Sequence, residues 1–132
     1  MAKNVKKKLI VDRYENEIYP NATLYVVKNG TYENLKKTFN LEKDEFDGNY
    51  DACLFSGVKN LPKDETCYVV LLDNSMIKRD ALYKLGVCTH EAMHYVIRLM
   101  TDIEMKINVV TGEACCYLQE WATKCIYRTL SK

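Results

Sequence analysis

Short apolar runs fill the first half of the chain, and their length and alternation are typical of β-strands. They lie at residues 5–13, 23–27, 50–55 and 66–72. The last run is the most apolar, so we expect this strand to be central in its sheet or covered on both faces. Between the second and third runs, Thr31 has the chemistry of an N-cap, and the spacing that follows predicts a short helix.

The second half of the chain changes to a period of three to four residues, which predicts amphipathic helices. Asp80 is expected to cap a helix that runs to about Met100, and Thr111 to cap another helix over residues 112–130. The apolar stripe of the first helix contains Ala81, Leu85, Cys88, Ala92, Val96 and Leu99. That of the second contains Cys115, Leu118, Ala122, Cys125, Ile126 and Thr129.

Together these elements predict an α+β fold in a single domain over residues 1–132. Residues 1–75 hold a small sheet of about four strands with one short helix. Residues 79–132 hold the two long helices. A chain of 132 residues is suited to one domain with one core.

Composition and charge narrow the class of protein. The formal net charge is +1, which argues against a nucleic-acid partner recognised by a basic surface. No apolar run is long enough for a membrane span or a secretory signal, so we expect a cytoplasmic protein whose six cysteines are reduced. The acidic segment 42–51 does not have the spacing of an EF-hand and is interpreted as a solvated loop.

The first long helix carries the motif HExxH as His90-Glu91-Ala92-Met93-His94, which uses both histidines of the chain. Residues four apart lie on one helical face, so the two imidazoles can converge on one metal ion. Glu91 lies about 100° round the helix, where it can reach a water molecule in the open coordination position and act as general base. His90 and His94 lie nearly opposite the apolar stripe, which argues against histidines that only fill the core.

A catalytic zinc site needs a third protein ligand. Glu113, in the first turn of the second helix, is the predicted ligand, and Glu120 is the alternative. A purely structural interpretation of Glu120 is a surface ion pair with Lys124. Tyr117, one turn after Glu113, is predicted to stabilise a developing oxyanion.

The same oxyanion role is open to Tyr127 and to Arg98. Cys88 is rejected as a metal ligand because, on a helical wheel, it lies on the face expected to pack against the sheet.

These residues resemble the gluzincin group of zincin metallopeptidases, in which HExxH on one helix is joined by a glutamate on the next. Segments 86–94 and 112–121 together also resemble minimal zincins of phage and prophage genes. The resemblance implies one zinc ion held by His90, His94 and Glu113, with Glu91 as base. It also implies that the strand at 66–72, or an edge strand near it, lies beside the cleft and pairs with an extended peptide.

The expected function is therefore a zinc-dependent hydrolase, a metallopeptidase acting on a peptide or protein substrate. The alternative is a zinc-binding but non-catalytic accessory protein, phage-encoded or prophage-derived, that acts on a host partner. A third interpretation is a structural domain in which the motif is accidental.

Overall fold

A computed structural model describes residues 7–19, 22–36, 38–39, 52–56 and 67–132. In chain order the strands and helices are β1 (Ile10–Tyr14), β2 (Thr23–Lys28), α1 (Tyr32–Leu35), β3 (Ala52–Ser56), β4 (Cys67–Leu72), the 3-10 helix η2 (Asn74–Lys78), α2 (Ala81–Asp102) and α3 (Gly112–Leu130). The predicted α+β class is confirmed. The acidic segment 42–51 lies outside the described residues, as do parts of the predicted strands at 5–13, 50–55 and 66–72.

The four strands form one mixed sheet in the order β1-β2-β4-β3. β1 runs antiparallel to β2, β2 runs parallel to β4, and β3 runs antiparallel to β4. All six residues of β4 are buried, which confirms that this strand is internal and covered on both faces. β3 is consequently an edge of the sheet.

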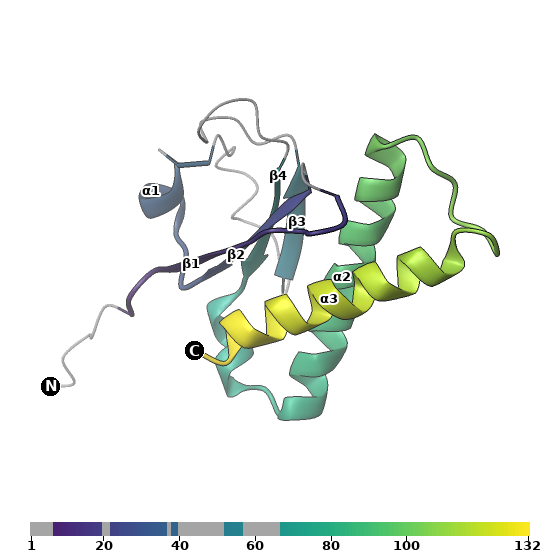
Figure 1. Cartoon of the computed structure of the whole chain (residues 1–132). Coiled ribbons are helices and arrows are strands. Elements are labelled where there is room, and N and C mark those ends of the chain that lie inside the picture. The colour runs from purple at the N-terminus through teal and green to yellow at the C-terminus, as the bar shows by residue number, and fades with distance from the viewer. Residues whose placement is uncertain (1–6, 20–21, 37, 40–51, 57–66) are drawn as a thin grey trace, which may run out of the picture.

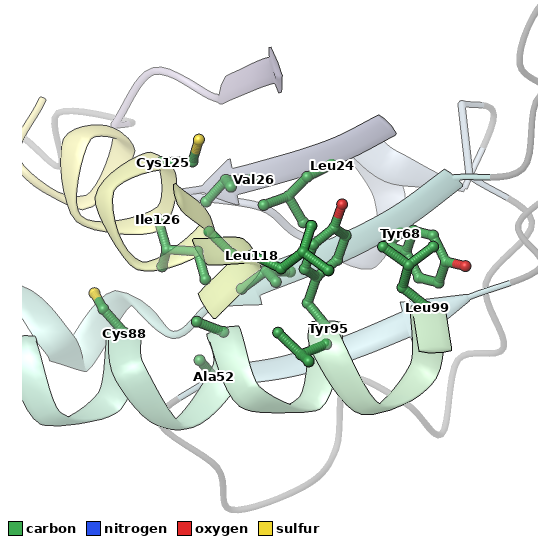
Figure 2. Packing of buried hydrophobic residues seen from close by; sticks show 14 of the residues in the cluster. Leu24, Val26, Ala52, Tyr68, Cys88, Tyr95, Leu99, Leu118, Cys125 and Ile126 are labelled. Atoms are coloured by element: carbon green, nitrogen blue, oxygen red, sulfur yellow. The ribbon is translucent and has the colours of Figure 1, made fainter. Parts of the chain in front are cut away.

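Helices α2 and α3 cross each other and cover one face of the sheet, while the short α1 lies on the other face (Figure 1). Alternate residues of β2 and β4 therefore enter two separate cores. Leu24, Val26, Tyr68 and Val70 pack with α2 and α3. Tyr25, Val27, Cys67 and Val69 pack with Leu35 and Phe39 around α1. Figure 2 shows the larger core, to which α2 contributes Tyr95 and Leu99 and α3 contributes Leu118 and Ile126.

The helix boundaries agree with the predicted caps. The Asp80 side chain accepts a hydrogen bond from the Tyr83 backbone N–H at 2.8 Å. Thr31 forms a reciprocal capping box with Asn34. Thr111 occupies the N-cap position of α3, but its side chain makes no cap hydrogen bond and instead donates to the Lys106 carbonyl at 2.6 Å.

The predicted apolar stripe of α2 is correct only from Cys88 onward. Cys88, Ala92, Val96 and Leu99 are buried, whereas Ala81 and Leu85 are exposed. The first turns of α2 extend below the sheet, where neither the sheet nor α3 covers them (Figure 1). Helical periodicity places residues on a common face, but it does not show how far the opposing surface extends.

The stripe of α3 is confirmed along its whole length. Its six predicted members are all buried: Cys115, Leu118, Ala122, Cys125, Ile126 and Thr129. Four of the six cysteines, Cys67, Cys88, Cys115 and Cys125, are buried as small apolar side chains. No helix within the described ranges is both long and apolar enough to cross a membrane.

Candidate metal centre

The two histidines meet on the exposed side of α2. Their Nε2 atoms are 3.2 Å apart and their ring centroids 4.8 Å apart. This convergence follows from the helix, because residues four positions apart are stacked one turn above the other. Two imidazole nitrogens that close together offer lone pairs to a single cation, as the sequence predicts.

Glu91 lies beside the histidines but on the buried edge of the helix. It is 4% exposed, and its Oε2 atom is fully buried with no hydrogen-bond partner in the described parts of the chain. Burial raises the pKa of Glu91 to about 7. A buried carboxylate without a partner is costly, and a nearby cation would compensate for that cost.

His90, Glu91 and His94 each place one ligand atom within 4.8 Å of the others, and in the described residues this is the group able to hold a metal ion. Two imidazoles and a carboxylate form a donor set that suits a divalent transition metal. The unpartnered Glu91 oxygen is the structural observation that fits a cation here. The residues therefore fit a metal ion.

The group opens into a pocket of about 510 Å³ between α2 and the edge strand β3. Its lining residues are Ala52, Cys53, Leu54, His90, Glu91, His94, Ile97, Arg98 and Thr101. The resemblance to zincins implies that either the strand at 66–72 or an edge strand near it lies beside the cleft. In the structure β4 is enclosed between β2 and β3, and it is β3 that borders this pocket.

Glu113 is not brought into this group. Its side chain is exposed in the first turn of α3. Gln119 links α3 to the histidine turn, because its Nε2 donates a hydrogen bond to the Thr89 carbonyl at 3.4 Å. Glu113 lies about 120° round the helix and about 9 Å along its axis from Gln119. Its role as third ligand stays a prediction.

Tyr117 and Glu120 lie on a different surface from the histidines. They line a second pocket of about 450 Å³ together with Trp121, Lys124 and residues 15–18. Tyr117 is 58% exposed there. Glu120 accepts a hydrogen bond from Lys124 at 2.8 Å, which confirms the predicted surface ion pair.

Of the other two oxyanion candidates, Arg98 lines the histidine pocket, whereas Tyr127 is half-buried against the core. The sequence did not indicate that Leu54 and Cys53 would border the site. Nor did it indicate that Tyr68 would contact Asp102 close to Arg98. These residues are brought together by strand pairing and helix packing, for which the chain carries no local signal.

Comparisons with known proteins give no further information on the site: no protein-family model, no curated protein and no solved structure matches this chain. The resemblance to zincins therefore rests on the sequence segments 86–94 and 112–121 alone.

Proposed function

We propose that the protein is a zinc-dependent hydrolase that cleaves peptide bonds. The observation that carries this proposal is the pair of histidine Nε2 atoms 3.2 Å apart, grouped with the buried and unpartnered Glu91 on the wall of a pocket. His90 and His94 would hold the zinc ion, and Glu113 is the predicted third ligand. Bound zinc would supply a Lewis acid for the scissile carbonyl and would lower the pKa of water.

Glu91 is the proposed general base and general acid. Its carboxylate takes one proton from the attacking water as the water oxygen bonds to the carbonyl carbon. It then gives that proton to the leaving nitrogen as the C–N bond breaks. Burial raises the pKa of Glu91 above that of an exposed glutamate, which favours its return of a proton to the leaving nitrogen.

Edge strand β3 supports a peptide as the substrate. Within the described residues β3 lies at the end of the strand order, and an extended peptide can add to a sheet edge as a further strand. β3 borders the histidine pocket through Ala52, Cys53 and Leu54. A peptide added there would lie beside the reacting groups.

The test is hydrolysis of a fluorogenic peptide library by the zinc-loaded protein and by Glu91→Gln. The variant should bind zinc with the stoichiometry of the wild type, while its turnover falls by about 100-fold or more, the usual contribution of general acid–base catalysis. Glu17→Gln is the control, because it makes the same change at an exposed position outside both long helices. Hydrolysis that survives Glu91→Gln would contradict the proposal.

A zinc-binding protein without catalytic activity is the second candidate. It is favoured by one observation, namely that Glu113 lies outside the group formed by the histidines and Glu91. If this candidate is correct, Glu91→Gln keeps both zinc and the biological effect of the protein. Wild-type protein loaded with zinc should then cleave no member of the peptide library.

A further inference from the structure

Arg98 lies in the same pocket as the candidate metal centre, one helical turn beyond His94. That turn advances about 6 Å along α2. Among the described residues that line the pocket, Arg98 is the one with a permanent positive charge. Its side chain is 55% exposed and is therefore accessible to a ligand.

The Arg98 guanidinium forms an ion pair with Asp102, which is itself hydrogen-bonded to Tyr68. The Arg98 Nε lies 3.7 Å from Asp102 Oδ1, and Asp102 Oδ2 accepts a hydrogen bond from the Tyr68 hydroxyl at 2.7 Å. Tyr68 is fully buried in β4, with its ring edge-on to Tyr95 at 5.3 Å. Arg98 is thus connected to the centre of the sheet.

This arrangement leaves one side of the guanidinium for a ligand. Asp102 is the single partner that the described structure gives Arg98, and it engages Nε. The N–H groups of the two terminal nitrogens form the planar fork that binds a carboxylate through two parallel hydrogen bonds. A peptide carries a free carboxylate of this kind at its C-terminus.

We propose that Arg98 binds the terminal α-carboxylate of a peptide, so that the protein removes residues from C-terminal ends. The inference rests on the proposed hydrolase function. A peptide residue spans about 3.3–3.6 Å, so the step from the histidines to Arg98 accommodates one or two residues after the scissile bond. Water adds across that C–N bond, which yields a shortened peptide acid and a free amino acid or dipeptide.

The pocket wall also indicates the side chain of the last residue. Leu54 of β3 and the 44%-exposed Ile97 of α2 line the same pocket as the histidines. Their apolar surface favours a substrate that ends in an aliphatic residue such as leucine.

A matched pair of substrates separates this role from oxyanion stabilisation. An arginine that contacts the scissile carbonyl accelerates cleavage of peptide acids and peptide amides alike. An arginine that binds the terminal carboxylate accelerates only the acids. The ratio of kcat/KM for the acid to kcat/KM for the amide is therefore the decisive quantity, and a loss of stability alone does not move it.

The kinetic experiment uses zinc-loaded protein with N-acetyl-Ala-Ala-Leu and its C-terminal amide. We expect the ratio to exceed about tenfold for the wild type, as for a charge-assisted, bidentate contact. Arg98→Gln should bring the ratio close to one, and Arg98→Lys should give an intermediate ratio. Arg128→Gln, an exposed arginine in the last turn of α3, is the matched control and should keep the wild-type ratio.

A binding experiment keeps the inference separate from the proposed function. Zinc-loaded Glu91→Gln is titrated with the same two peptides by calorimetry, with and without Arg98→Gln. Tighter binding of the acid by about tenfold, removed by Arg98→Gln, supports the role of Arg98 even if the wild type hydrolyses neither peptide, in which case only the hydrolase proposal fails. Equal binding of acid and amide, or equal cleavage of both, overturns the inference.

Discussion

At the scale of single residues, the site depends on the different exposure of adjacent residues on one helix, since one side chain faces solvent while the next faces the core. His90 and Glu91 are adjacent in sequence, yet His90 is exposed and Glu91 is 4% exposed. The rotation of about 100° per residue produces this difference, because it places Glu91 at the margin of the buried face. A carboxylate at that margin loses water without gaining a hydrogen bond, which leaves it suited to a cation or a proton.

Removal of one imidazole should remove most of the metal affinity. We expect His94→Ala to weaken zinc binding by more than about 100-fold, since changes in the outer shell alone cost roughly 10- to 100-fold. The affinity is measured by competition with a chromophoric chelator. Undiminished affinity in His94→Ala would mean that the histidines are not the ligands.

Glu113 and Glu120 form a matched pair for the third ligand. Both are exposed on α3, and among the described residues it is Glu120 that has a lysine partner, Lys124. The sequence prediction expects Glu113→Gln to weaken zinc binding at least about tenfold and Glu120→Gln to leave it unchanged. The same chelator competition measures both variants, and full affinity in Glu113→Gln would remove Glu113 from the ligand set.

At the scale of elements, the contact between β1 and the end of α3 joins the two halves of the chain. Asp12 of β1 accepts hydrogen bonds from Thr129 and Lys132, each at 2.7 Å. Burial alone raises the pKa of Asp12, but these hydrogen bonds and the lysine charge outweigh burial, so its net pKa lies below the ordinary value.

A lowered carboxyl pKa makes this contact dependent on pH. The stabilisation is present above the ordinary value of 3.8 and is lost as the pH falls through the lower pKa of the folded state. Asp12→Asn should therefore lower the free energy of unfolding by about 1 kcal/mol at pH 7. The difference from wild type should shrink at pH values below 3.8.

Urea titrations at several pH values measure the effect. Glu17→Gln, in the exposed connection after β1, is the control and should change the free energy of unfolding by less than about 0.5 kcal/mol. A pH-independent loss in Asp12→Asn would show that the carboxylate charge does not stabilise this contact.

At the scale of the whole molecule, the larger core contains residues from both halves of the chain. Tyr95 of α2 accepts a hydrogen bond from Asn16 at 2.9 Å and donates one to the Ala22 carbonyl at 2.8 Å. Leu118 of α3 is 1% exposed in the same core. The sheet and the long helices therefore share one packed interior, and we expect them to unfold as one unit.

Leu118→Ala tests this cooperativity. The cavity should cost about 2–5 kcal/mol. In urea, far-UV circular dichroism and the fluorescence of Trp121 should report the same midpoint for the wild type, and both midpoints should fall together in the variant. Cys116→Ala, at an exposed position of the same helix, is the control. Separate midpoints for the two probes would contradict a single cooperative domain.

The agreement between sequence and structure is best where the determining contacts are local. The caps at Thr31 and Asp80, the burial of β4 and the apolar stripe of α3 all follow from residues within a few positions of one another. The prediction fails for Ala81 and Leu85, because the extent of the surface opposite α2 depends on distant parts of the chain.

The sequence by itself determined that His90 and His94 converge and that Glu91 stands beside them, because all three lie within two turns of one helix. Only the tertiary structure decided that β3 borders this group, that Arg98 shares its pocket, and that Glu113 and Tyr117 lie outside it. Helical geometry repeats every 3.6 residues and can be read from spacing. Strand order and the approach of two helices are set by packing between segments far apart in sequence, which spacing does not encode.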